Sequence, residues 1–219
     1  MKPLKLAIGN KNYSSWSMRP WVLLTQAGIA FEEIQLKFSA EGKVLGIEPH
    51  SPTRQVPVLI VDGEPVWDTL AICEAVAELF PQKNLWPADA RARRMARSIC
   101  AEMHAGFRNL RGAMPVNIRA SLAGKGMNPA VQQDIDRIVE IWQSCRERFG
   151  GNGELLFGQF TIADAYYAPV ATRFLTYAVT LPPAAKRYAD ALLALSALRE
   201  WMAQARRETE FVRADEPYA

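Results

Sequence analysis

Three serines and an arginine stand close together near the beginning of the chain. The segment Asn12-Tyr13-Ser14-Ser15-Trp16-Ser17-Met18-Arg19 precedes a run of apolar residues at helical spacing, which ends at Gly28. The start of a helix presents free backbone N–H groups and the positive end of the helix dipole, which together favour an anion. A serine in this place can direct its hydroxyl at a ligand, or it can only cap the helix. The residues alone leave both interpretations open.

A proline stands directly before a short apolar run in Gln55-Val56-Pro57-Val58-Leu59. Proline has no backbone N–H to donate, so it is uncommon inside a buried strand. A cis bond between Val56 and Pro57 would turn the chain sharply and expose the backbone before it, and we predict that bond. A trans proline at the start of a strand is the simpler alternative.

An acid and a hydroxyl precede another apolar helical run in Trp67-Asp68-Thr69-Leu70. Either side chain can cap the helix that follows. The same pair can also hold the amino and carboxylate groups of a ligand, because the helix start favours the carboxylate and the acid favours the ammonium.

The elements predicted around these residues change in character along the chain. Strands are predicted at 4–8, 31–36, 57–61 and 65–67, with Asp62-Gly63 as a hairpin turn, and helices at 17–27 and 69–80. From residue 88 onward the periodicity predicts helices only, at 88 to about 121, 129–149, 161–177 and, as one or two helices, within 184–207. Residues 82–87 are the natural linker between two parts.

Composition excludes several classes of protein. The 219 residues are 49% hydrophobic, which suits a folded core, and no apolar run reaches the roughly 18 to 20 residues of a membrane helix. A net charge of +3 does not indicate a nucleic-acid partner. The three cysteines, Cys73, Cys100 and Cys145, are too widely spaced for a zinc site or a disulfide framework. We therefore expect a cytoplasmic protein with reduced thiols, no metal and no membrane partner.

The order of these elements and motifs resembles the glutathione transferases, over essentially the whole chain. The resemblance is to serine-type enzymes, above all the zeta class and related bacterial proteins, whose active-site helix begins S-S-C-S-x-R where this chain has 14–19. The family's Q-V-P appears at 55–57, and its E/D/Q-S-x-A-I appears as Asp68-Thr69-Leu70-Ala71-Ile72. Thr161-Ile162-Ala163-Asp164 resembles the capping box of a core helix. Trp16, in the place of the zeta-class cysteine, is a departure.

The resemblance implies a two-domain fold with glutathione as co-substrate. An α/β, thioredoxin-like domain at 1–83 would bind glutathione, and an all-α helical domain at 88–219 would contribute the electrophile pocket. The peptide part of glutathione would be held by Gln55, Val56, Pro57, Asp68, Thr69 and Lys43. The Ser14 hydroxyl would donate a hydrogen bond to sulfur and stabilise the thiolate, with Ser15 as the second candidate. The electrophile would lie against Trp16, Phe107, Arg111, Met114 and Arg173.

The implied function is a glutathione S-transferase of the detoxifying kind, active as a homodimer on a small hydrophobic electrophile. A zeta-like isomerase of the maleylacetoacetate type is an alternative; the family arginine that binds a substrate carboxylate would then be Arg173, which stands about three residues nearer to Asp164 than in the zeta pattern. A non-catalytic interaction module with the same fold is another alternative. Such relatives often lose the donor at the first helix or the acid–hydroxyl pair, whereas Ser14, Pro57, Asp68 and Thr69 are all present here. Disulfide exchange or dehydroascorbate reduction normally needs a cysteine at position 14 and is disfavoured.

Overall fold

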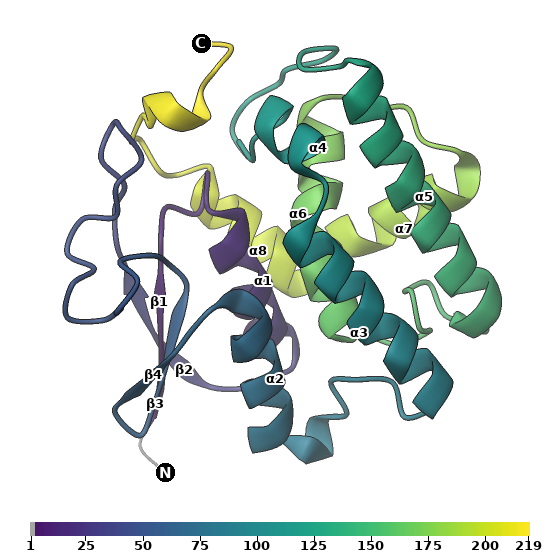
Figure 1. Cartoon of the computed structure of the whole chain (residues 1–219), viewed down its shortest axis with the longest axis horizontal. Coiled ribbons are helices and arrows are strands. Elements are labelled where there is room, and N and C mark those ends of the chain that lie inside the picture. The colour runs from purple at the N-terminus through teal and green to yellow at the C-terminus, as the bar shows by residue number, and fades with distance from the viewer. Residues whose placement is uncertain (1–2) are drawn as a thin grey trace.

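The first part of the chain forms a four-stranded mixed sheet with two helices. The computed structural model describes residues 3–219 (Figure 1). The strands β1 (Leu4–Ile8), β2 (Phe31–Gln35), β3 (Val58–Val61) and β4 (Glu64–Val66) lie in the order β2-β1-β3-β4. The β1–β2 pair is parallel and is connected through α1 (Ser15–Gln26), whereas the β1–β3 and β3–β4 pairs are antiparallel. After β4 the chain enters α2 (Thr69–Leu79).

Local sequence explains the turns of this part. Asp62 and Gly63, between β3 and β4, both have positive φ angles, of 53° and 106°. A two-residue hairpin turn of this kind suits Asp-Gly, because glycine tolerates positive φ at no steric cost. The strands and helices predicted here are confirmed, although α1 begins at Ser15 rather than at residue 17 because the Ser14 side chain caps it.

The second part is helical and is built around one buried helix. It contains α3 (Ala90–Ala105), α4 (Arg108–Ala113), α5 (Pro129–Phe149), α6 (Ile162–Thr176), α7 (Pro183–Ala194) and α8 (Ser196–Ala205), with short 3-10 turns at η1 (Pro81–Lys83) and η2 (Arg213–Asp215). Every residue of α6 except Leu175 is buried. Figure 1 shows α6 behind α3 and α4, and α1 contacts both α6 and α8, so the two parts meet along α1.

The predicted capping box at the start of α6 is confirmed. The carboxylate of Asp164 accepts hydrogen bonds from the backbone N–H of Thr161 at 2.8 Å and from its hydroxyl at 3.0 Å. The same carboxylate accepts the backbone N–H of Leu156 at 3.2 Å and the Tyr188 hydroxyl at 3.1 Å. Asp164 is fully buried, so these bonds connect three segments of the helical core.

The predicted single helix from 88 to about 121 is wrong. The chain breaks between α3 and α4, where Gly106 is extended and Phe107 has a φ of 55°. A side chain on Gly106 would lie 2.8 Å from the carbonyl of Glu102, so the break accommodates glycine best. Beyond α4, Pro115 cannot continue the hydrogen-bonding ladder of a helix. Residues 114–121 therefore run as an irregular segment past the site.

The C-terminal segment returns to the first part of the molecule. After α8 it runs back past the loop between β1 and α1 and forms η2 near the loop that follows β2, as the yellow trace in Figure 1 shows. Glu208 accepts hydrogen bonds from the backbone N–H groups of Lys11 and Asn12, at 2.8 and 2.9 Å. Within residues 3–219 no helix is both long and apolar enough to cross a membrane.

Candidate active site

Ser14 is the residue that caps the first helix. Its Oγ accepts the backbone N–H of Ser17 at 3.3 Å and lies 2.7 Å from the Ser17 Oγ, to which it donates. The side chain is 7% exposed, and Ser14 lines a cavity of about 710 Å³ between the two parts of the chain, here called the main cavity. The predicted donor therefore lies at a helix N-terminus that opens into a cavity of ligand size.

Ser15 lies beside Ser14 in the same cavity lining. It is partly exposed, and among residues 3–219 no hydrogen bond engages its hydroxyl. Its backbone carbonyl accepts a 2.9 Å hydrogen bond from Arg19, a fully buried residue that also donates to the carbonyl of Tyr166 at 3.1 Å. Burial lowers the pKa of Arg19 to about 10. Its guanidinium is therefore charged at neutral pH, within the N-terminal part of α1.

Trp16 separates the main cavity from a second one. The second cavity, of about 430 Å³, is here called the small cavity, and Trp16 lines both. The guanidinium carbons of Arg19 and Arg111 lie 4.2 and 4.9 Å from the centroid of its ring, and the ring of His104 meets it edge-on at 5.2 Å. Cations above an aromatic face are attracted to it. Side chains from both parts of the chain therefore hold the Trp16 ring in place.

Val56 lies where the two cavities meet. Gln55 and Val56 line both cavities, whereas Pro57 lines the small one. The Val56–Pro57 peptide bond is cis, as predicted. Among residues 3–219 the backbone N–H and C=O of Val56 make no hydrogen bond. A peptide ligand lying alongside can therefore pair with this backbone as an added strand does.

Asp68 and Thr69 stand at the start of α2, in the lining of the small cavity. The Asp68 carboxylate caps α2 by accepting the backbone N–H of Leu70 at 3.3 Å, and the hydroxyl of buried Thr69 donates to the carbonyl of Trp16 at 3.3 Å. Asp68 also lies 3.1 Å from Nε2 of His104, whose Nδ1 is 3.2 Å from the Tyr166 hydroxyl. The small cavity thus combines the N-terminus of a helix with an acid.

The main cavity is strongly charged on its helical side. Arg108, Arg111 and Arg173 line it, and Asp215 is the carboxylate among its lining residues within 3–219. Burial, and then the charge of Arg108, lowers the pKa of Arg111. An excess of positive charge in a partly enclosed space favours an anionic ligand.

Three of the predicted residues lie outside both linings. Lys43 is exposed in the loop after β2, between Gly42 and Val44, which do line the main cavity. Phe107 and Met114 are 7% and 0% exposed and belong to the hydrophobic core instead of facing a cavity. They lie at the two ends of α4. The predicted unbroken helix from 88 to about 121 has no such ends, so it placed both side chains wrongly.

His104 and Asp215 line the cavities without having been predicted. Nothing local in the sequence marks His104, because its partner Asp68 is far away in the chain. Asp215 lines the main cavity only through the return of the C-terminal segment, which no local pattern shows. Among residues 3–219 no group of three or more metal-ligating side chains is present.

Comparison with known families assigns both parts of the chain. The family model described as the glutathione S-transferase N-terminal domain matches residues 13–79, and that for the C-terminal domain matches residues 128–204. The maleylacetoacetate isomerase of Rattus norvegicus is 26% identical over 195 residues, which cover 85% of this chain and 87% of that protein. The probable maleylacetoacetate isomerase of Caenorhabditis elegans is 29% identical over 166 residues, or 74% of this chain and 76% of that protein.

Solved structures agree on the fold. A glutathione transferase homolog from Burkholderia gl BGR1, with bound glutathione, superposes with a TM-score of 0.72 at 23% identity, covering 94% of this chain and 100% of that one. A diazinon-metabolizing glutathione S-transferase of the silkworm Bombyx mori also gives a TM-score of 0.72, at 16% identity, with 94% and 98% covered. Because the two family models together span more than half of the chain, this protein belongs to the glutathione S-transferase family.

Proposed function

We propose that this protein binds glutathione and activates its thiol for attack on a small electrophile. The observation that carries the proposal is the unpaired backbone of Val56, which lines both cavities within reach of the start of α1. A tripeptide thiol has the parts that such a place requires: an extended backbone, a charged γ-glutamyl end and a sulfur.

The small cavity suits the γ-glutamyl end of glutathione. Its carboxylate would meet the start of α2 at Thr69, and its ammonium would meet the Asp68 carboxylate. The N–H and C=O of Val56 would pair with the peptide backbone, with Gln55 beside it. Lys43 would meet the glycyl carboxylate from the neighbouring loop, whose residues Gly42 and Val44 line the main cavity.

The main cavity suits the thiol and its electrophile. A thiol with a pKa near 8.5 is only a few per cent ionised at neutral pH, so a useful catalyst lowers that pKa. A hydroxyl hydrogen bond from Ser14, the N-terminus of α1 and the buried charge of Arg19 all favour a thiolate. The electrophile would then lie between Trp16 and the arginines Arg111 and Arg173.

Calorimetry with glutathione, followed by a conjugation assay with chlorodinitrobenzene, tests this proposal. We expect saturable binding at millimolar glutathione or below, and consumption of one glutathione for each product formed. Absence of binding at several millimolar glutathione would contradict the proposal. Binding without conjugation of any electrophile would favour the non-catalytic interaction module.

A second candidate is a glutathione-dependent isomerase of the maleylacetoacetate type. It is favoured by the three arginines of the main cavity, which suit a substrate with carboxylates, and by the names of the two relatives above. Stoichiometry separates the candidates, because an isomerase returns glutathione unchanged whereas a conjugating transferase consumes it. Incubation with maleylacetoacetate and measurement of both product and free thiol decides between them.

Assembly and location stay predictions from the family. We expect a cytoplasmic homodimer, and light scattering at micromolar concentrations tests the dimer. A monomer across that range would contradict it.

A further inference from the structure

A buried positive charge faces the main cavity without a carboxylate in contact. Arg173, on α6, is 4% exposed and belongs to the cavity lining. Its guanidinium donates from Nε to the carbonyl of Met114 at 2.9 Å and from Nη1 to that of Pro169 at 3.5 Å. Among residues 3–219 no carboxylate oxygen lies within 4.0 Å of its nitrogens. A buried guanidinium stays protonated, so this charge needs a counter-charge nearby.

Asp215, in η2, is a carboxylate that lines the same cavity as Arg173. It is partly buried. Burial and then Glu216 raise the pKa of Asp215, while the charge of Arg173 lowers it. Burial, Arg19 and Arg111 lower the pKa of Arg173, and Tyr177 and then Asp215 oppose them. Arg173 and Asp215 therefore line one cavity with opposite charges and without direct contact, so a ligand in that cavity meets both.

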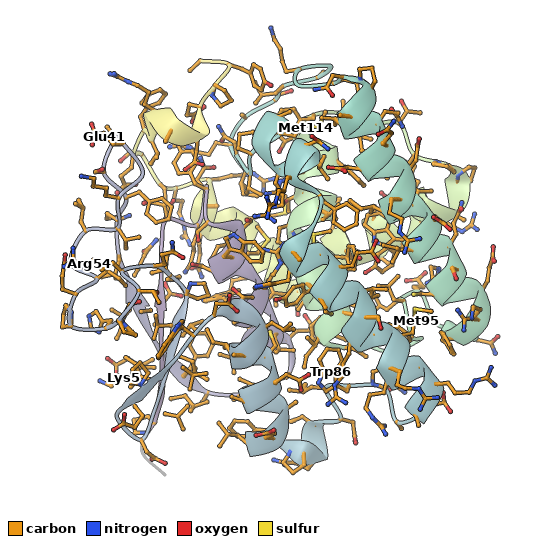
Figure 2. All side chains as sticks on the ribbon, viewed as in Figure 1. Lys5, Glu41, Arg54, Trp86, Met95 and Met114 are labelled. Carbon is orange, nitrogen blue, oxygen red and sulfur yellow. The ribbon has the colours of Figure 1, made fainter. Side chains whose placement is uncertain are left out.

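The C-terminal segment holds Asp215 in this place through contacts on both sides. Glu216 accepts a 2.7 Å hydrogen bond from the Tyr13 hydroxyl, and Tyr218 donates one of 2.7 Å to the carbonyl of Ala113. The backbone N–H of Ala214 lies 3.4 Å from the carbonyl of Ala40. Figure 2 shows Glu41 and Met114 on opposite sides of the short η2 helix, so the segment lies between the loop after β2 and the end of α4.

We propose that Asp215 is a specificity-determining residue, which offsets the charge of Arg173 and so limits how strongly the main cavity prefers an anionic electrophile over a neutral one. The inference rests on the proposed function, because it takes the main cavity as the electrophile site. With Asp215 present, Arg173 is partly neutralised and a neutral aromatic compound can bind. Without it, the cavity keeps three arginines and gains preference for a carboxylate.

Equilibrium binding of two matched probes tests the inference without the need for turnover. Nitrobenzoate and nitrobenzamide share a ring and differ in charge. Calorimetry measures their dissociation constants with and without glutathione, for the wild type and for Asp215→Asn. The matched control is Asp190→Asn, which removes one negative charge from α7, where Asp190 pairs with Lys186 at the surface. Asp215→Ser repeats the test if the asparagine variant does not fold, as judged by circular dichroism.

We expect Asp215→Asn to tighten binding of nitrobenzoate about tenfold, the size expected for two charges several ångströms apart in a partly exposed site. Binding of the neutral nitrobenzamide should change less than twofold. Asp190→Asn should leave the ratio of the two constants as in the wild type. An unchanged ratio in Asp215→Asn, or failure of the wild type to bind either probe at millimolar concentration, would overturn the inference. A shifted ratio in a protein that binds no glutathione would uphold the inference and refute the proposed function instead.

Discussion

The hydroxyl of Ser14 donates a 2.7 Å hydrogen bond to the hydroxyl of Ser17, one turn further along α1. Ser17 is fully buried and also accepts the backbone N–H of Gly9 at 3.2 Å. A hydroxyl donates one hydrogen bond and can accept two, so Ser17 can reverse the direction and donate to Ser14. Ser14 would then be free to donate to a thiolate in the main cavity, with Ser17 holding it in position.

Replacement of Ser17 tests this positioning role. Ser17→Ala removes the partner of Ser14, and we expect a loss of about 2- to 12-fold in kcat/KM near neutral pH, the worth of one neutral hydrogen bond. Glutathione affinity should change little, because Ser17 lies outside both cavity linings. Ser17→Thr keeps the hydroxyl and should restore most of the activity. A loss in both variants that does not depend on pH would indicate a purely structural role.

Asp68 allows capping and ligand binding to be separated. Asparagine caps helices as well as aspartate does, so Asp68→Asn should leave the Tm nearly unchanged. Loss of the charge that faces the glutathione ammonium should weaken glutathione binding about 10- to 150-fold, as measured by calorimetry. The matched control is Asp89→Asn, because Asp89 caps α3 by accepting the N–H groups of Arg91 and Ala92 outside both cavity linings. Equal affinities in the two variants would remove Asp68 from the proposed site.

The capping box of α6 should dominate stability. Asp164→Ala leaves the N–H groups of Leu156 and Thr161 and the Tyr188 hydroxyl without their buried acceptor. Unpaired buried polar groups cost about 1 to 3 kcal/mol each, so we expect a loss of about 3 to 5 kcal/mol in the free energy of unfolding. Chemical denaturation monitored by circular dichroism measures it. A loss below about 1 kcal/mol would show that these donors find other partners.

Features encoded by neighbouring residues were predictable from the sequence. The turn at Asp62-Gly63 and the helix that begins at Pro129 and ends before Gly150 depend on local conformational preferences, and the structure has them where they were expected. The residues of the first three motifs could likewise be placed at element boundaries. In the folded chain Ser14 lines the main cavity, Thr69 lines the small one, and Val56 lines both.

Features set by distant contacts were not predictable. The apolar spacing of Met103 and Leu110 continues across Gly106 and Phe107, so periodicity alone shows no break between α3 and α4. Burial of Phe107 follows from that break. Asp215 reaches the main cavity only because the C-terminal segment packs against residues roughly two hundred positions earlier, and no pattern near Asp215 records that contact.

The central claim is that the Ser14 hydroxyl stabilises the thiolate of bound glutathione. The most direct measurement is the pH dependence of thiolate absorbance in the binary complex, for the wild type, Ser14→Ala and Ser15→Ala, with kcat/KM for chlorodinitrobenzene in parallel. One charge-assisted hydrogen bond is worth about 1.5 to 3 kcal/mol, so Ser14→Ala should raise the thiol pKa by about 1 to 2 units and lower kcat/KM about 10- to 150-fold near neutral pH. The defect should shrink as the pH rises past the thiol's own pKa, and Ser15→Ala should titrate as the wild type does. A raised thiol pKa in Ser15→Ala with an unchanged one in Ser14→Ala would contradict the account and transfer the role to Ser15.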